Sequence, residues 1–302
     1  MKHIFIINPT AGKKDISKKI IEEIKSVFKD AEYLVHITSA PLDAKNFVHE
    51  YCYNHPNDEL RFYSCGGDGT LNEVVNGAFG YANASVTCYP SGSGNDFVKY
   101  FGKKDDFLNL ENLINGQEVL VDLLKYEDRY VLNICNIGFD ADVADRMIKY
   151  KRLPLVSGTG AYILGVAVSF IHRLSRDLKI TVDDKLVYQG QGLLCAMANA
   201  ICYGGGFYCA PLAKVNDGLL DVVAIKKMSR LKFIKFIKYY KNGTHLAEPR
   251  LQDYIVVTQG KTVTIESREL LNYAIDGEMG QAKKMSLTVV PQAIKFVIPN
   301  KQ

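Results

Sequence analysis

Residues 65–77 read CGGDGTLNEVVNG and follow the strand-like run RFYS at residues 61–64. Three glycines, one carboxylate and one hydroxyl fall within residues 66–70, just before a helix-like run. In an open parallel sheet, ligands gather at the carboxyl ends of strands, where loops lead into helix N-termini. Glycines permit positive φ and lack Cβ atoms, so successive N–H groups can point at phosphate oxygens near the helix dipole. The stretch therefore predicts a phosphate-binding loop in an α/β sheet.

Asp68 is the one acidic residue in this loop. A carboxylate beside a polyphosphate repels it unless a divalent cation, or a water bound to one, lies between them. The alternative is a glycine-rich turn in which Asp68 caps the following helix. The loop by itself leaves both interpretations open.

Composition indicates an ordinary globular protein. The chain has 302 residues, 47% of them hydrophobic, which favours two domains of usual size. A net charge of +4 is too small to indicate a nucleic-acid partner, and we expect none. Seven cysteines without a CxxC pair read as reduced thiols of a cytoplasmic protein. The N-terminal run is too short for a signal peptide, and the interrupted apolar tract at 155–171 is not expected to span a membrane.

The pattern of predicted secondary structure changes along the chain. Residues 2–120 alternate strand-like and helix-like runs, which predicts a parallel sheet covered on both faces. From about residue 120, strand-like runs are separated by short turns, with a hairpin signal at Asp183 and Asp184. The predicted fold class is an α/β N-terminal domain with a parallel sheet, followed by a mainly antiparallel β-sandwich C-terminal domain.

Six glycine-rich or acidic stretches occur in a fixed order. They are NPTAGKK at 8–14, GGDGTLNEVVNG at 66–77, PSGSGNDF at 90–97, NIGFDADV at 136–143, YGGGFYCAPLAKVNDGLLDV at 203–222 and IDGE at 275–278. Over nearly its whole length the sequence resembles the diacylglycerol kinase catalytic family, which includes bacterial soluble lipid kinases and sphingosine kinases. NAD kinases share GGDGT, but PSGSGND and the long β half ending in IDGE fit lipid kinases better. The Walker pattern GxxxxGK[ST] is absent.

The resemblance implies one domain that binds the nucleotide and one that binds the lipid substrate. Residues 1–122 would be the nucleotide-binding domain, and residues 123–290 the lipid-substrate domain, with the last strand, about 291–302, a candidate for returning to the first. The expected function is an ATP-dependent lipid kinase that converts diacylglycerol to phosphatidic acid. The alternatives are another lipid acceptor, such as phosphatidylglycerol or a sphingoid base, and a catalytically silent lipid-binding relative.

The resemblance also implies that ATP and Mg²⁺ are the cofactors. The nucleotide-side candidates are Asn8, Thr10, Gly12, Lys13, Lys14, Thr38, Gly66, Gly67, Gly69, Thr70, Asn72, Glu73, Ser93 and Asn95. Ser93 stands where the family usually has threonine, and the hydroxyl is kept. Without the resemblance, residues 8–14 read as a strand-ending turn with solvated lysines, and Asn95 reads as a helix cap.

The predicted catalytic residues are Asp68, Asp276 and Glu278. Phosphoryl transfer needs a carboxylate that accepts the proton of the acceptor hydroxyl. Residues two apart in a strand share one face, so Asp276 and Glu278 are expected on the same side. The resemblance implies that this motif supplies the base from the β domain, and the choice between the two carboxylates stays open. An isolated Asp-Gly-Glu would otherwise read as an acidic hairpin turn.

A further stretch, residues 214–219, matches a family loop that holds a structural Mg²⁺. The resemblance implies a side-chain ligand from Asp217 and carbonyl ligands from Lys214 and Leu219, a shell of oxygens that suits this ion. Without the resemblance, the stretch is a turn before a strand.

Residues 229–242, SRLKFIKFIKYYKN, fit a helix. Its apolar face is Phe233, Ile234, Phe236, Ile237 and Tyr240, and its opposite face carries Lys232, Lys235 and Lys238. An apolar face edged with lysines is typical of a helix on an anionic membrane surface. The alternative is a helix packed on its own domain with solvated lysines. The expected partners are a lipid substrate and a peripheral anionic membrane surface, and a homodimer is a candidate assembly.

Overall fold

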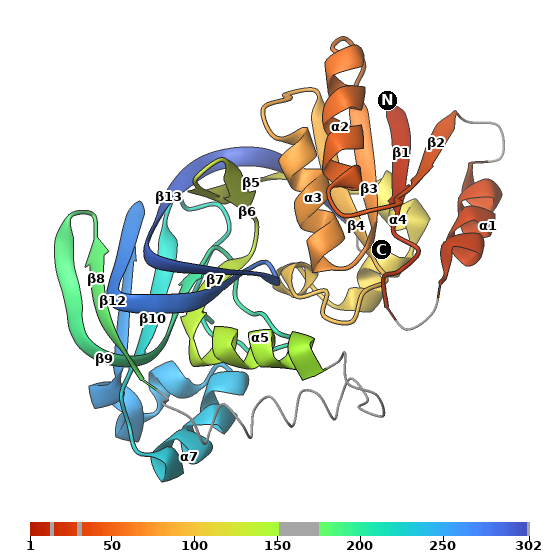
Figure 1. Ribbon diagram of the computed structural model, residues 1–302. Coiled ribbons are helices and arrows are strands. Elements are labelled where there is room, and N and C mark those ends of the chain that lie inside the picture. Colours follow the sequence, from red (N-terminus) through yellow and green to blue (C-terminus); the bar gives the residue numbers. More distant parts are fainter. Residues whose placement is uncertain (13–14, 29–31, 151–174, 301–302) are drawn as a thin grey trace. The chain divides into compact units, whose positions relative to one another are not determined.

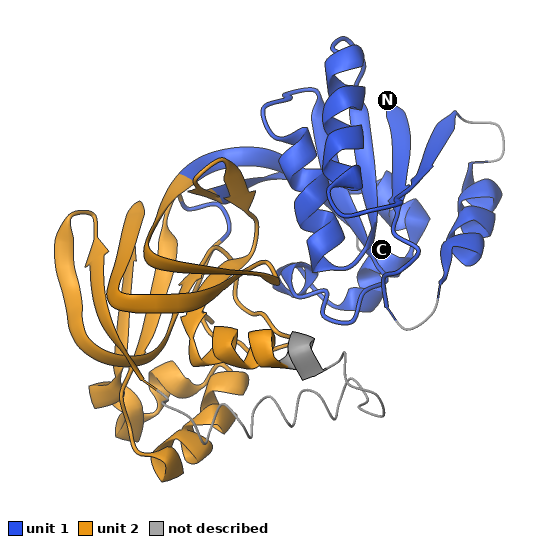
Figure 2. Ribbon diagram, viewed as in Figure 1, with its two compact units in different colours: residues 1–123, 215–217, 290–302 blue, residues 124–214, 218–289 orange. Residues whose placement is uncertain are grey.

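The computed structural model describes residues 1–12, 15–28, 32–150 and 175–300 (Figure 1). The chain forms two compact units (Figure 2). Unit 1 comprises Met1–Leu123, Val215–Asp217 and Val290–Gln302, and unit 2 comprises Leu124–Lys214 and Gly218–Val289. The boundary at Leu123 lies next to the predicted one at residue 122. What each domain does stays a prediction.

Unit 1 is built on a parallel sheet with the strand order β4, β3, β1, β2. The strands are β1 (Lys2–Ile7), β2 (Tyr33–Ile37), β3 (Leu60–Gly66) and β4 (Ala84–Pro90). β3 and β4 are buried along their whole length, as expected of parallel strands covered on both faces. The end of β13 (Glu278–Ile298) pairs in parallel with β4 through Lys295 and Phe296.

The helices of unit 1 follow the apolar spacing of the sequence. They are α1 (Ser17–Val27), α2 (Asp43–Asn54), α3 (Asp68–Ala78) and α4 (Leu110–Ile114), with 3-10 helices η1 (Phe97–Tyr100) and η2 (Lys104–Leu108). α2 buries Ala44, Val48 and Cys52, which recur every four residues and so share one face. A Cβ atom on Gly77 of α3 would lie 2.8 Å from the Cβ of Val48, so the glycine lets α2 and α3 pack closely.

Unit 2 is an antiparallel β structure with the strand order β11, β10, β9, β7, β12, β13, in which β8 pairs with β9 and β12. Its strands are β5 (Gln117–Tyr126, shared with unit 1), β6 (Arg129–Val131), β7 (Ile134–Gly138), β8 (Arg176–Val182), β9 (Lys185–Ala198), β10 (Leu220–Lys226), β11 (Ile255–Gly260), β12 (Thr262–Ile275) and β13. Its helices are α5 (Phe139–Tyr150), α7 (Arg230–Lys241), η3 (His245–Ala247) and η4 (Pro249–Tyr254).

The hairpin predicted at Asp183 and Asp184 is confirmed. These residues join β8 to β9 with φ values of 45° and 62°, both positive, as a two-residue type I′ turn requires. The predicted change from a parallel α/β half to an antiparallel β half is confirmed as well.

The helix predicted at residues 229–242 is present as α7, and the Ser229 side chain caps it by accepting a hydrogen bond from the Lys232 amide. Of the two interpretations of its apolar face, the structure supports the helix packed on its own domain for three of the five residues. Phe233, Phe236 and Tyr240 are buried in the hydrophobic core of unit 2, as in the packed-helix alternative. The reason is that this face meets the apolar side chains of β9 and β10, which the helix covers.

No helix among the described residues is long and apolar enough to cross a membrane. The tract at 155–171 lies outside the described residues.

Candidate active site

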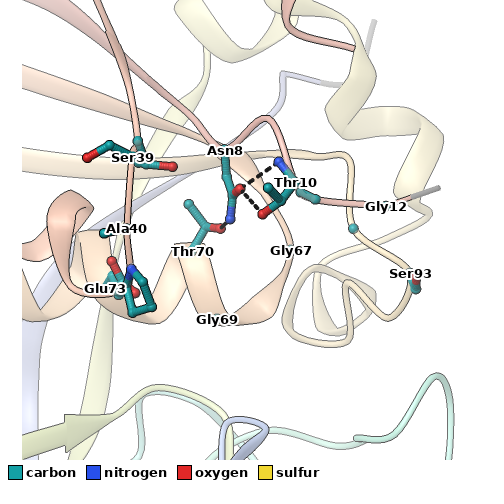
Figure 3. A pocket seen from close by; sticks show the side chains of 14 residues that line it. Asn8, Thr10, Gly12, Ser39, Ala40, Gly67, Gly69, Thr70, Glu73 and Ser93 are labelled. Atoms are coloured by element: carbon teal, nitrogen blue, oxygen red, sulfur yellow. Dashed lines mark hydrogen bonds between the residues drawn. The ribbon is translucent and has the colours of Figure 1, made fainter. Parts of the chain in front are cut away.

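A pocket of about 480 Å³ lies in unit 1, where β1, β2, β3 and β4 end (Figure 3). The residues that line it come from the loops after these four strands and from the start of α3. They are Asn8, Thr10, Ala11, Gly12, Thr38, Ser39, Ala40, Pro41, Gly67, Gly69, Thr70, Glu73, Gly92 and Ser93. Loops at the carboxyl ends of parallel strands are where ligands bind in open α/β sheets.

Asn8 connects the loop after β1 to the start of α3. Its Oδ1 accepts hydrogen bonds from the backbone N–H of Thr10 (2.9 Å) and from the Thr10 hydroxyl (2.8 Å). Its Nδ2 donates to Oγ1 of Thr70 at 2.9 Å. Figure 3 shows these three side chains side by side on the pocket wall. The site therefore carries fixed amide and hydroxyl groups, the kind that bind phosphate oxygens.

The glycines at the site allow two loops to touch. The amides of Ser91 and Gly92 both donate to the carbonyl of Gly66, at 2.9 and 3.1 Å. A Cβ atom on Gly92 would lie 2.4 Å from the Cα of Gly67. The backbones thus approach closer than a side chain at position 92 would permit, whereas a Cβ atom on Gly67 would lie 3.3 Å from the Cα of Gly92, a tight contact.

Gly92→Ala is expected to weaken MgATP binding. The new Cβ meets backbone rather than a flexible side chain, so the two loops must separate. Overpacking of this kind costs about 1–3 kcal/mol, and if the whole cost falls on nucleotide binding the affinity drops by roughly 5- to 150-fold. Asp58→Ala is the control, because it removes an exposed partner of Lys2 (2.8 Å) from the same unit and does not line the pocket. Isothermal calorimetry checks both variants, and wild-type affinity in Gly92→Ala would contradict the role of this contact.

Two carboxylates hold the pocket rim at residues 38–43. Glu73 Oε1 accepts the Leu42 amide at 3.0 Å, and Leu42 has φ of 67°. Asp43 accepts both the amide (2.7 Å) and the hydroxyl (2.8 Å) of Ser39, and these bonds lower the pKa of Asp43. Glu73 thus contributes both to the lining and to the shape of the rim.

Five residues of the lining were not predicted from the sequence: Ala11, Ser39, Ala40, Pro41 and Gly92. Ser39, Ala40 and Pro41 directly follow Thr38, where β2 ends. The rule that ligands bind at the carboxyl ends of parallel strands could have found them. Ala11 and Gly92 lie inside motifs that the sequence analysis did quote.

Asp68 supports the loop after β4 rather than lining the pocket. Its Oδ1 accepts the Asp96 amide at 2.6 Å and the Phe97 amide at 3.4 Å. Burial raises the pKa of the Asp68 carboxyl and the nearby Asp96 carboxylate raises it further, whereas the backbone N–H donors lower it. Its predicted role at the phosphates stays a prediction.

The other nucleotide-side candidates divide into three groups. Those that line the pocket are Asn8, Thr10, Gly12, Thr38, Gly67, Gly69, Thr70, Glu73 and Ser93. Three do not line the pocket: Gly66, Asn72 and Asn95. Asn95, with φ of 48°, accepts a hydrogen bond from the Gly92 amide (3.1 Å) through Oδ1 and donates one to the Gly92 carbonyl (2.6 Å) through Nδ2. Lys13 and Lys14 lie outside the described residues.

The two carboxylates of IDGE lie in unit 2 at the turn between β12 and β13, so the expectation that they share one face of a strand is wrong: Asp276 is in the turn, with φ of 46°, and Glu278 begins β13. Their surroundings differ as well. Asp276 Oδ2 accepts the Leu132 amide at 2.7 Å, and Oδ1 accepts the amides of Asn133 (3.1 Å) and Ile134 (3.0 Å). The Glu278 side chain is 54% exposed and pairs with Arg129. Asp276 therefore holds a backbone segment, whereas Glu278 projects from the turn.

The loop at residues 214–219 has no regular secondary structure. Lys214 and Asp217 are exposed and Leu219 is half-buried. The carbonyl of Val215, inside the loop, accepts the Asp122 amide at 2.7 Å. The described part of the chain has no group of three or more His, Cys, Asp or Glu residues that could hold a metal. That finding does not test the predicted site, which uses one carboxylate and two backbone carbonyls. The Mg²⁺ site at Lys214, Asp217 and Leu219 stays a prediction.

Two family models match the chain. Residues 2–126 match the diacylglycerol kinase catalytic domain, and residues 133–298 match the YegS C-terminal NAD kinase beta sandwich-like domain. The chain belongs to the diacylglycerol kinase catalytic family. A diacylglycerol kinase of Bacillus subtilis (strain 168) is 27% identical over 98% of this chain and 96% of its own length. One from Staphylococcus aureus (strain bovine RF122 / ET3-1) is 27% identical over 98% of this chain and 91% of its own.

Solved structures share the fold of this family member. A putative diacylglycerol kinase from Bacillus anthracis str. Sterne has a TM-score of 0.74 and 21% identity, covering 99% of this chain and 97% of that one. An NAD kinase from Archaeoglobus fulgidus in complex with ATP has a TM-score of 0.50 and 13% identity, covering 100% of this chain and 94% of that one. These likenesses confirm the predicted fold class, an α/β domain followed by a β-sandwich-like domain.

Proposed function

We propose that this member of a kinase family transfers the γ-phosphoryl group of ATP to the hydroxyl of a lipid, with diacylglycerol as the acceptor and phosphatidic acid as the product. The observation that carries the proposal is the pocket at the ends of four parallel strands, with its touching glycines and the fixed Asn8–Thr70 pair. The names of the relatives support the lipid acceptor.

The chemistry of the pocket fits the phosphates of ATP. Hydroxyls of Thr10, Thr70 and Ser93 are among its lining groups, and α3 begins beside it at Asp68. Neutral donors at a helix N-terminus stabilise phosphate oxygens, because the unpaired N–H groups and the helix dipole favour negative charge. Glycines leave the backbone open to close approach.

The donor set also fits Mg²⁺ that arrives with the nucleotide. Mg²⁺ keeps several waters and binds through one or two carboxylates plus substrate phosphates rather than in an all-protein cage. Asp68 and Asp96 are two carboxylates beside the loop after β4, and Asp96 also pairs with Lys99 at 2.5 Å. Burial raises the pKa of Asp68 and the nearby Asp96 carboxylate raises it further, so a cation close to both would favour their charged forms. When bound, the ion neutralises charge on the phosphates.

Asp276 and Glu278 are proposed to handle the acceptor. The acceptor oxygen forms a bond to the γ-phosphorus, the bond from this phosphorus to the bridging oxygen breaks, and ADP leaves with the electron pair. A carboxylate takes the proton of the hydroxyl. Glu278 is the more exposed of the two, and Asp276 fixes the turn from which it projects.

Labelled ATP and a panel of lipids in mixed micelles test the function. The panel contains diacylglycerol, phosphatidylglycerol and a sphingoid base, each with and without Mg²⁺. We expect labelled phosphatidic acid from diacylglycerol. If a different lipid is labelled, the enzyme is still a lipid kinase but the proposed acceptor is wrong. If no lipid is labelled under any condition, the proposal is overturned.

We further propose that the enzyme docks on an anionic membrane through the outward face of α7. Leu231 is 75% exposed and Ile234 is 54% exposed, one helical turn apart, and Lys235 and Lys238 extend the same face. Lys232, which the sequence assigned to the charged face, instead lies 4.0 Å from the ring centroid of Tyr254. The proposed surface is therefore smaller than the sequence suggested.

Reversing this surface is expected to reduce vesicle binding. The variant carries Leu231→Ser, Ile234→Ser, Lys235→Glu and Lys238→Glu, and each lost lysine near an anionic surface is worth about 1 kcal/mol. In a sedimentation assay we expect at least about tenfold weaker binding to phosphatidylglycerol vesicles, with unchanged MgATP affinity. The control is Lys185→Glu with Leu186→Ser, since Leu186 is 57% exposed elsewhere on the same unit. Equal loss in both variants would count against a role specific to α7.

A further inference from the structure

Arg129 lies at the tip of the hairpin of β5 and β6, in unit 2, and reaches the IDGE turn. Its Nη1 donates to Oε2 of Glu278 at 3.1 Å, and its Nη2 donates to the hydroxyl of Tyr273 at 3.3 Å. The guanidinium carbon lies 5.4 Å from the ring centroid of Tyr126 and 5.9 Å from that of Tyr273. Both distances are within the range of cation–π attraction. Arg129 is thus held by two rings while it binds one carboxylate.

The rings themselves are fixed. Tyr273 and Gly280 are directly opposite in the pairing of β12 with β13. A Cβ atom on Gly280 would lie 2.3 Å from the Tyr273 ring, so the ring occupies the space that the glycine leaves free. Tyr126 meets Tyr273 edge to face, with centroids 5.6 Å apart and planes at 70°. A chain of contacts therefore runs from Gly280 through Tyr273 and Arg129 to Glu278.

Glu278 needs such support because of its exposure. Its side chain is 54% exposed, and a long exposed carboxylate samples several rotamers unless a partner selects one. The side chain of Arg129, at 30% exposure, is less free than its partner. An exposed ion pair adds little to stability, so the consequence of this pair is the orientation of the carboxylate.

We propose that Arg129 is a positioning residue, which holds the Glu278 carboxylate in the orientation needed for phosphoryl transfer. The inference rests on the proposed function, in which Glu278 handles the acceptor hydroxyl. Misplacement of a reacting group by about 1 Å can cost on the order of 100-fold in rate. The planar guanidinium makes the two hydrogen bonds and the ring contacts together, which a lysine ammonium cannot reproduce.

The test compares Arg129→Met, Arg129→Lys, Glu278→Gln and the double variant Arg129→Met with Glu278→Gln. We expect Arg129→Met to lower kcat for the lipid by about 10- to 100-fold with an unchanged KM for MgATP. Arg129→Lys should recover part of that loss. The double variant should be no slower than Glu278→Gln alone, because the arginine then has no carboxylate to position. Lys179→Met is the control, since it breaks the exposed pair with Glu266 (2.8 Å) on the same unit.

Unfolding midpoints of the same variants check that each variant is folded. They should all stay near wild type, because an exposed ion pair adds little to stability, and a large fall in Arg129→Met would mean that its loss of kcat reflects unfolding and not the position of Glu278. If the losses in kcat multiply, Arg129 does not act through Glu278. If the wild-type protein phosphorylates no lipid, the proposed function fails. If the wild type is active and Arg129→Met keeps its full kcat, only the inference about Arg129 fails.

Discussion

Asp68→Ala is expected to lower the turnover of lipid phosphorylation by at least about 100-fold, the scale typical of lost electrostatic groups at an active site. The Oδ1 atom of Asp68 accepts the amides of Asp96 and Phe97, so its loss leaves two backbone donors without this acceptor. The loop that carries Gly92 and Ser93 into the pocket is then free to move. Nucleotide affinity should fall together with turnover.

Asp68→Asn separates support from charge. The amide oxygen can still accept the Asp96 amide, but the negative charge is gone. If Asp68 acts by supporting the loop, Asp68→Asn keeps much of the activity and all of the nucleotide affinity. If Asp68 organises a metal ion, Asp68→Asn is as impaired as Asp68→Ala.

The measurements for Asp68 are kinase kinetics, calorimetry with MgATP and thermal unfolding. Asp58→Ala is the control, because it removes an exposed partner of Lys2 (2.8 Å) from the same unit. Near wild-type turnover in Asp68→Ala would show that Asp68 is needed neither to support the loop nor to organise a metal ion.

Asp276→Asn and Glu278→Gln are both expected to lower turnover by about 100-fold or more, but for different reasons. Glu278→Gln removes a charge from a side chain that is 54% exposed, so nucleotide affinity and the free energy of unfolding should stay near wild type. Asp276→Asn replaces an acceptor of backbone amides by an NH₂ group, which cannot accept a hydrogen bond. An unsatisfied buried donor costs about 1–3 kcal/mol, so this variant should also be less stable.

Kinase assays, calorimetry with MgATP and urea unfolding distinguish the two carboxylates. Glu266→Gln serves as the control, since Glu266 forms exposed ion pairs with Lys179 and Lys284 at 2.8 and 3.3 Å. A Glu278→Gln variant with full activity would exclude it as the base. If both amide variants are fully active, IDGE is only a turn and the proposed mechanism is wrong.

The local elements of the fold could be predicted from the sequence, because hydrophobic periodicity and turn chemistry are properties of neighbouring residues. The alternation of strand-like and helix-like runs predicted the parallel α/β half, and the pair Asp183 and Asp184 predicted the hairpin of β8 and β9. The glycine-rich motifs predicted most of the pocket lining as well, because loops at the ends of parallel strands converge wherever the sheet forms.

Only the tertiary structure decided what each side chain meets. Periodicity placed Phe233 and Phe236 on one face of α7, but it could not say that β9 and β10 would cover that face. The backbone amides that donate to Asp68 are 28 and 29 residues away in the sequence, and those that donate to Asp276 are 142 to 144 residues away. Arg129 lies 149 residues from Glu278. Such partners are chosen when distant segments pack together, because a hydrogen bond depends on distance and angle in space and not on spacing in the sequence.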